Sequence, residues 1–155
     1  MPVSACSAET EPPPVFPDLG ALPTVDEHQY FSSKVYRFAT PDGVMCESAG
    51  YNPYFQWTCV GPAGAGSAQL DLSSYARRDG TPATVGTSQG GTDPAMYPVL
   101  PIKHQIRITA PVIYADGRKV TLVCGTPAPK TMACFVDDAV GTHGFVLSPE
   151  RNWAF

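Results

Sequence analysis

Hydrophobic and polar residues alternate over several short stretches of this chain. The clearest stretch covers residues 54–60, where Phe55, Trp57 and Cys59 recur at every second position. A period of two is typical of a β-strand with one buried face. Further short strands are expected within residues 30–38, 44–47, 102–108, 112–124, 131–136 and 143–148.

Turn-forming residues separate these stretches. Thr40-Pro41-Asp42-Gly43 follows the first of them, and there proline presets φ while glycine accepts a positive φ. Asp116-Gly117 divides two apolar runs and gives the strongest hairpin pattern in the chain. About seven or eight short strands joined by such turns predict an all-β fold, either an antiparallel β-sandwich or a small barrel.

Two segments lack this alternation. Residues 61–101 are rich in small residues and proline, with little periodicity beyond Leu70 and Leu72. We expect a long loop excursion there, with one short helical turn near residues 73–78. Residues 1–28 are polar and proline-rich, which predicts an extended tether, and residues 29–155 are expected to form a single domain.

Composition supports this architecture and limits the classes of partner that the protein can bind. Glycine and proline account for 14 and 17 of the 155 residues, which favours turns and strands over long helices. Basic residues number 10 and acidic residues 14, giving a net charge of −4. This balance argues against a nucleic-acid partner, because phosphate neutralisation needs clustered lysine and arginine.

Four of the five cysteines fall into two local pairs. Cys46 and Cys59 are separated by 13 positions, and Cys124 and Cys134 by 10. Each pair brackets a predicted hairpin, so a disulfide within each would stabilise the fold by about 3 kcal/mol in the chain-entropy description. A zinc site is the alternative, but neither pair has C-x-x-C spacing. Disulfides indicate an oxidising compartment outside the cytoplasm.

The fifth cysteine, Cys6, has an informative context. Val3-Ser4-Ala5-Cys6 resembles the lipobox of bacterial lipoproteins, in which small residues precede a cysteine that is lipidated and becomes the mature N-terminus. The polar, proline-rich residues 7–14 follow it. We therefore expect Cys6 to anchor the domain to the outer face of the cytoplasmic membrane. The alternative is an incidental free cysteine in a disordered tail.

Two features of a membrane protein are missing from the sequence. No run of about 18 apolar residues occurs, so no segment is expected to span a bilayer. The charged and apolar regions of a signal peptide are also missing, so we expect the sequence to represent a processed or truncated form.

Two motifs resemble a known family. Residues 38–46, with the partner cysteine Cys59, form the first, and Cys124 and Cys134 followed by residues 142–148 form the second. They are similar to motifs of small exported disulfide-bonded domains of actinobacteria, of mycobacterial type, many of them lipoproteins and of unknown function. The resemblance implies a disulfide-stapled β domain outside the cell. It implies no enzymatic activity.

Catalytic and metal-binding patterns are weak. The chain has no G-x-S-x-G, H-E-x-x-H or S-x-x-K motif that would nominate a nucleophile or a catalytic metal. His143, next to a glycine, is interpreted as a structural histidine, and Asp26-Glu27-His28 as an exposed turn rather than a metal site. Asp137-Asp138 is interpreted as a solvated turn. No catalytic residue, metal or cofactor is expected.

Aromatic residues gather in the loop that the first cysteine pair would close. Tyr51, Asn52 and Tyr54 lie between Cys46 and Cys59, and exposed tyrosines commonly serve as contact residues. We treat them as a candidate binding loop, with a purely structural role as the alternative.

Three functions remain open at this stage. The leading hypothesis is a cell-envelope lipoprotein that acts as a non-enzymatic accessory or binding module on an integral-membrane protein or complex. The first alternative is a carrier that holds an apolar envelope ligand between its sheets. The second is a cell-wall hydrolase or inhibitor.

The cysteine pairing yields a direct test. Alkylation of the denatured protein without reductant should label no more than one of the five cysteines, because four are predicted to be oxidised. Intact mass spectrometry reads the number of labels, and reduction before alkylation provides the control. Five labelled thiols without reductant would contradict both disulfides.

Overall fold

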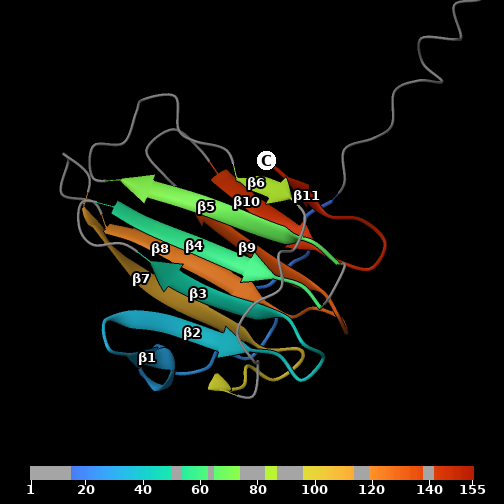
Figure 1. Ribbon diagram of the computed structural model, residues 1–155, viewed down its shortest axis with the longest axis horizontal. Coiled ribbons are helices and arrows are strands. Elements are labelled where there is room, and N and C mark those ends of the chain that lie inside the picture. Colours follow the sequence, from blue (N-terminus) through green and yellow to red (C-terminus); the bar gives the residue numbers. More distant parts are fainter. Residues whose placement is uncertain are drawn as a thin grey trace, which may run out of the picture.

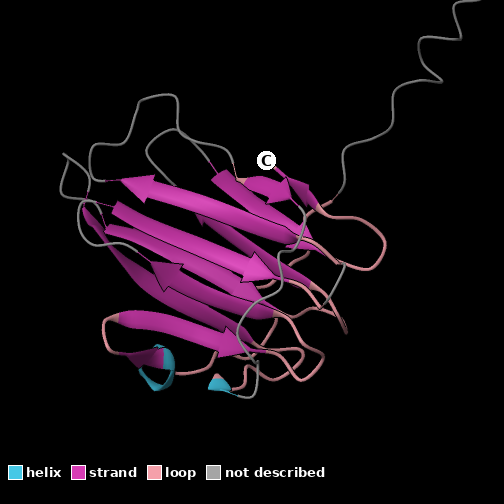
Figure 2. Cartoon of the chain, in the orientation of Figure 1, coloured by secondary structure: helices cyan, strands magenta, loops and turns pink. Residues whose placement is uncertain are grey.

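Two antiparallel β-sheets packed face to face make up the protein (Figures 1 and 2). The computed structural model describes residues 15–49, 54–62, 65–73, 83–86, 96–113, 119–137 and 142–155. Strands follow chain order within each sheet, so each connection inside a sheet joins adjacent strands. The fold is a β-sandwich, as the alternation of the sequence predicts.

The first sheet has six strands in the order β1 to β6. Their bounds are Phe31–Ser32 (β1), Val35–Ala39 (β2), Met45–Ala49 (β3), Tyr54–Val60 (β4), Ser67–Ser73 (β5) and Thr84–Gly86 (β6). A short 3-10 helix, η1, covers Glu27–Tyr30 just before β1 and contacts β2 and β7. No helix in the described part of the chain has the length and apolar character to cross a membrane.

The second sheet has five strands in the order β11-β10-β9-β8-β7. Their bounds are Gln105–Ile113 (β7), Lys119–Gly125 (β8), Met132–Asp137 (β9), Thr142–Leu147 (β10) and Trp153–Ala154 (β11). The outermost strands of both sheets are short except β7, and short edges limit unwanted strand pairing with other chains.

The core between the sheets follows from the alternation in β4. Phe55, Trp57 and Cys59 are buried, whereas Gln56 is exposed on the outer face. The Trp57 ring lies 5.7 Å from Phe38 and 6.5 Å from Phe55, measured between ring centroids. β4 packs against β7, and β5 packs against β10. The faces predicted for residues 54–60 are therefore confirmed where the side chains are described.

Both predicted disulfides are present and lie in this core. Cys46 faces Cys59 across β3 and β4, and Cys124 faces Cys134 across β8 and β9. The Cα–Cα separation is 4.1 Å in each pair, close to the short spacing of a non-hydrogen-bonded antiparallel pair. Two buried disulfides favour an oxidising, extracytoplasmic environment.

The two disulfides also touch each other. The Sγ atoms of Cys59 and Cys134 are 3.9 Å apart, although these residues belong to different sheets. Each disulfide fastens two strands of one sheet, and their contact lies where the sheets meet. The sheets are therefore joined at this point by packing rather than by a covalent bond.

Residues 16–25, which we call the strap, cross the outer face of the second sheet. The strap begins at an aromatic cluster, in which the Phe16 ring lies 5.4 Å from Phe135, 5.5 Å from Phe155 and 6.4 Å from Trp153. All three contacts are edge-to-face, the geometry that aromatic pairs prefer. The start of the strap is thus fixed beside the last strand of the chain.

The strap then runs to the opposite edge of the same sheet. Leu19 is buried against this face, over Gly125, whose missing side chain leaves room for it. Gln105 donates a hydrogen bond from Nε2 to the carbonyl of Leu22, at 2.7 Å. Thr24 pairs with Gln105 as a parallel bridge and partly covers the edge of β7.

Two segments differ from the prediction. Residues 16–25 of the expected tether pack on the second sheet as the strap, and residues 1–14 lie outside the described residues. The loop excursion expected at residues 61–101 is wrong in part, because β5 and β6 lie within it. β5 pairs with β4 along its whole length. The alternation of Ala68, Leu70 and Leu72 marks this strand, but a single small residue and two leucines were too weak a pattern to identify it.

The expected strand at residues 30–38 is also divided. Ser33 and Lys34 have positive φ angles of 52° and 67° and form a two-residue turn between β1 and β2. Neither residue is a glycine or asparagine, the usual residues of such a turn, so no turn pattern marks this position.

Gly144 on β10 packs closely against the backbone of Cys134 and the side chain of Phe155. A Cβ atom there would overlap the carbonyl oxygen of Cys134 and come within 2.8 Å of the Phe155 ring. We expect Gly144→Ala to lower the free energy of unfolding by at least about 2 kcal/mol, since neighbouring backbone cannot move aside cheaply.

Gly86→Ala is the matched control for this change. A Cβ atom at Gly86 would meet only the Ser67 hydroxyl, at an ordinary 3.8 Å. Its effect should stay within about 0.5 kcal/mol. Urea denaturation of both variants under oxidising conditions makes the comparison, and equal midpoints would contradict the close packing at β10.

Candidate functional site

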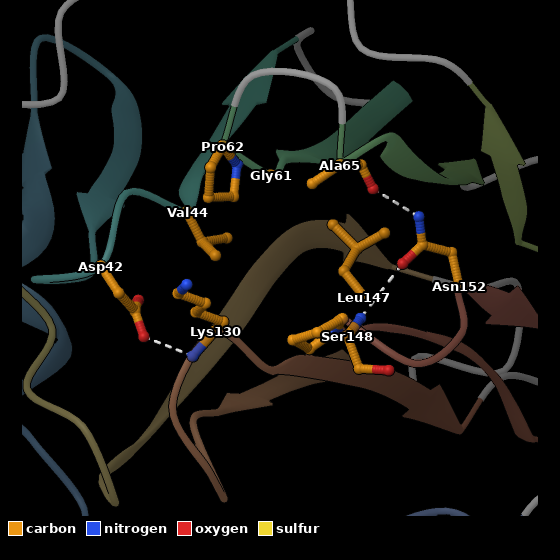
Figure 3. Close-up of a pocket in the computed structure, with 10 residues that line it drawn as sticks. Asp42, Val44, Gly61, Pro62, Ala65, Lys130, Leu147, Ser148 and Asn152 are labelled. Atoms are coloured by element: carbon orange, nitrogen blue, oxygen red, sulfur yellow. Dashed lines mark hydrogen bonds between the residues drawn. The ribbon is translucent and has the colours of Figure 1, made fainter.

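Four turns gather at one end of the sandwich and enclose a pocket. They are the connections β2–β3, β4–β5, β8–β9 and β10–β11, two from each sheet. The pocket has a volume of about 340 Å³ and lies between these turns (Figure 3). Its lining residues are Asp42, Val44, Gly61, Pro62, Ala65, Lys130, Leu147, Ser148, Pro149 and Asn152. We call it the loop-end pocket.

Asp42 fixes one side of this pocket. The turn that contains it closes through a hydrogen bond from the Gly43 amide to the Thr40 carbonyl, at 3.1 Å. The Thr40 hydroxyl donates to Oδ1 of Asp42 at 2.5 Å and accepts from the Val44 amide at 3.0 Å. Oδ2 of Asp42 accepts a hydrogen bond from the Lys130 amide (Figure 3). One carboxylate therefore ties a turn of the first sheet to a turn of the second.

Asn152 makes an equivalent connection on the other side. Its Oδ1 accepts a hydrogen bond from the Ser148 amide at 3.1 Å, and its Nδ2 donates to the Ala65 carbonyl at 2.5 Å (Figure 3). Gly66 has a φ of 97°, and a Cβ atom there would lie 2.5 Å from Nδ2 of Asn152. A glycine at this position lets the asparagine reach across, so the pocket is held from both sides by side-chain to backbone hydrogen bonds.

The pocket is mainly apolar, with one cation. Val44, Pro62, Leu147 and Pro149 supply apolar surface, and the Lys130 side chain extends toward Val44 (Figure 3). The Asp42 carboxylate also lines the pocket, and within the described ranges no ion pair joins it to the Lys130 ammonium.

Ser148 is the hydroxyl that lines this pocket, and it is occupied locally. Its Oγ donates to the Arg151 carbonyl at 2.7 Å and accepts from the Arg151 amide at 3.1 Å. A nucleophilic serine needs a neighbouring base that accepts its proton. The geometry at Ser148 therefore suits a residue that stabilises the β10–β11 turn.

The sequence-predicted site residues fall into two groups. Cys46, Cys59, Cys124 and Cys134 pair as predicted. Cys6, Tyr51 and Asn52 lie outside the described residues.

Tyr54 begins β4, pairs with Ser73, and sits at the opposite end of that strand from the loop-end pocket. The anchor and the aromatic binding loop therefore stay predictions.

The turn at Asp26-Glu27-His28 does not gather its side chains around one point. Oδ1 of Asp26 accepts from the His28 amide at 3.0 Å and contacts Nδ1 of His28 at 2.9 Å. These contacts, with the amide as the largest cause, lower the pKa of Asp26 below its usual 3.8. Oε2 of Glu27 instead accepts from the Thr109 amide at 3.1 Å. The described ranges contain no group of three residues suited to hold a metal.

Sequence reasoning missed the residues that build the pocket. Thr40 to Gly43 gave a clear turn pattern, but nothing in it showed that the Asp42 carboxylate reaches the opposite sheet. Asn152 stood in a closing aromatic segment without any motif of its own. Both roles depend on contacts across 88 and 87 positions of the chain, which no local pattern reveals.

Comparison with known proteins identifies no relative. No family model, no curated protein and no solved structure matches this chain. The resemblance to exported actinobacterial domains therefore stays an expectation from the two sequence motifs.

Asn152→Ala tests the brace across the pocket. The change removes two hydrogen bonds to backbone groups, and we expect the free energy of unfolding to fall by about 1–3 kcal/mol. Gln56→Ala is the control, because its amide bonds only to Asp71 on the exposed face, at 3.1 Å. Chemical denaturation measures both, and an Asn152→Ala effect no larger than the control would contradict the bracing role.

Proposed function

We propose that this protein is an extracytoplasmic binding module, held at the membrane through a lipid on Cys6, that serves a membrane-protein partner without catalysing a reaction. The loop-end pocket carries the binding part of the proposal. It is preformed, because Asp42 and Asn152 brace its turns. Its apolar walls and single lysine suit binding, and its one hydroxyl is engaged by backbone.

The anchoring part rests on the lipobox-like residues 3–6 and on the strap. A tethered module acts at high effective concentration near its partner when the link is short. Few residues separate Cys6 from the strap, since Phe16 is already packed against Phe135 and Phe155. The two disulfides agree with a location outside the cytoplasm.

A carrier of an apolar ligand is less well supported. Such a carrier needs space between its sheets. The fully buried Trp57, Phe38 and Phe145 fill that region, and the disulfide contact between Cys59 and Cys134 lies in it. A hydrolase is supported least, since Ser148 has backbone rather than a base as its partner.

The anchor is tested by expressing the complete precursor in its native host. Wild-type protein should sediment with membranes and carry a lipid mass on Cys6, whereas Cys6→Ser should be released into the soluble extracytoplasmic fraction. A free Cys6 thiol on membrane-bound protein would contradict the anchor.

The binding role is tested in the same cells by photo-crosslinking. A photoreactive residue in place of Pro149 at the pocket should capture one integral-membrane protein reproducibly, and the same residue in place of Thr121, exposed on β8, should not. Equal products from the two positions, or none from Pro149, would contradict a partner at the loop-end pocket.

A further inference from the structure

The outer faces of the two sheets present different side chains. On the first sheet, the register places Arg37, Glu47 and Thr58 side by side on β2, β3 and β4. Asp71 of β5 lies on the same face, where the Gln56 amide donates to its Oδ1 at 3.1 Å. These side chains form a polar surface, on which two carboxylates accompany one guanidinium.

The outer face of the second sheet carries aromatic rings. Its aromatic cluster consists of Phe16, Phe135, Trp153 and Phe155, in which the Trp153 ring lies 5.4 Å from Phe155. All four side chains remain partly exposed at the surface. The rings therefore stabilise the start of the strap and also offer apolar surface to a partner.

Two cations share this face with the aromatic cluster. Arg107 pairs with Val123, which in turn pairs with Phe135, so Arg107 lies in the same row of the sheet. Lys119 is exposed on β8, and its alternation with the buried positions places it on the face of Val123. Neither cation forms an ion pair within the part of the chain that the structure describes. The strap adds one exposed carboxylate, Asp18, so cations outnumber carboxylates among these side chains.

Aromatic rings beside cations suit the surface of an anionic membrane. Amphipathic and aromatic side chains are favoured at the level of the lipid headgroups, where one part is apolar and the other wet. Lysine and arginine near this level are attracted to anionic headgroups. The polar face of the first sheet, with its excess of carboxylates, lacks both features.

The position of the aromatic cluster along the chain selects a membrane as its occupant. Phe16 belongs to the cluster and begins the strap, which passes behind the second sheet in Figure 1, in blue. Ten positions separate Phe16 from Cys6, a distance of at most about 36 Å for a fully extended chain. Because the chain enters the domain at the cluster, this face is held nearest to a lipid on Cys6. The inference thus rests on the anchor of the proposed function.

We propose that the outer face of the second sheet lies on an anionic phospholipid membrane. The aromatic cluster contacts the headgroup region, and Arg107 and Lys119 lie beside the phosphates. The polar face of the first sheet points toward water. The loop-end pocket lies between turns at one end of the sandwich, so it stays uncovered and close to the membrane, where an integral-membrane partner can reach it.

The test attaches the full 155-residue chain to vesicles by chemical means. Cys6 reacts with a maleimide phospholipid, because the other four cysteines are paired in disulfides. The vesicles contain equal parts of phosphatidylglycerol and phosphatidylcholine, with acyl chains brominated near the headgroups. Bromine quenches tryptophan at short range, so Trp153 should lose most of its emission. Trp153→Phe should abolish the quenching, because the remaining Trp57 is fully buried between the sheets.

A second attachment point shows whether orientation is responsible. Met96 is 74% exposed and lies with Ser32 and Ser33 beside β1, at the edge of the first sheet. A variant with Cys6→Ser and Met96→Cys carries the lipid at this edge, which should hold Trp153 away from the bilayer and reduce its quenching severalfold. Equal quenching from the two attachment points would overturn the proposal, since mere crowding at the vesicle would then explain it.

Two charge variants test the electrostatic contact in the chain coupled through Cys6. Arg107→Gln should lower the ratio of membrane-bound to free domain, taken from the quenched fraction of Trp153, by about fivefold. Lys34→Gln removes the same charge from the exposed β1–β2 turn and should leave this ratio unchanged. Equal effects of the two variants would overturn the assigned face, and urea denaturation confirms that each variant is folded.

Unquenched Trp153 in the chain coupled through Cys6 would also overturn the proposal and leave the aromatic cluster to a protein partner. The lipid is attached chemically, so this outcome does not depend on whether cells lipidate Cys6. It does not depend on crosslinks from Pro149 either. Failure of the membrane-facing surface is therefore distinguishable from failure of the proposed anchor or of the loop-end pocket.

Discussion

The architecture depends on two disulfides, each of which fastens a pair of adjacent strands and which meet where the sheets pack together. Cys46–Cys59 fastens the two middle strands of one sheet, and Cys124–Cys134 fastens β8 to β9 in the other. Because the bonded strands are already neighbours, each disulfide fixes the register of a hairpin rather than its partner. Cys59 and Cys134 approach each other to 3.9 Å in the core between the two sheets. Trp57 and Phe38, which are fully buried, pack in the same core.

The sheets meet without a covalent link, so their alignment relies on noncovalent braces at the periphery. Asp42 and Asn152 connect the turns at one end, and each forms hydrogen bonds to backbone of the opposite sheet. η1 contacts both sheets at the edge of β2 and β7. Asp42 and Asn152 therefore stabilise the packing of the two sheets and also shape the loop-end pocket. The geometry of this pocket thus depends on the packing of the sandwich.

The fold was predictable where its pattern is local. The alternation places Phe55, Trp57 and Cys59 on one face of a strand, and the structure buries all three. The two cysteines of each pair lie directly opposite each other on a hairpin, as their spacing predicts. β5 was not predicted, because its side chains are small or polar apart from two leucines. The candidate sites were less predictable still. Asp42 and Asn152 acquire their roles from residues far along the chain, and no local motif marks either role.

The strap brings the two ends of the described chain together. Phe16 and Phe155 are in ring contact at 5.5 Å, and the Phe155 amide and carbonyl pair with Gly144 on β10. Adjacent termini make a circularly permuted protein feasible, with a short linker from residue 155 to the strap and new ends opened in a turn elsewhere. A permuted protein with new ends at the β1–β2 turn would be attached at the β1 edge of the first sheet. The surfaces of the domain would then face the opposite way relative to its attachment point. Substitution of single side chains cannot change this orientation.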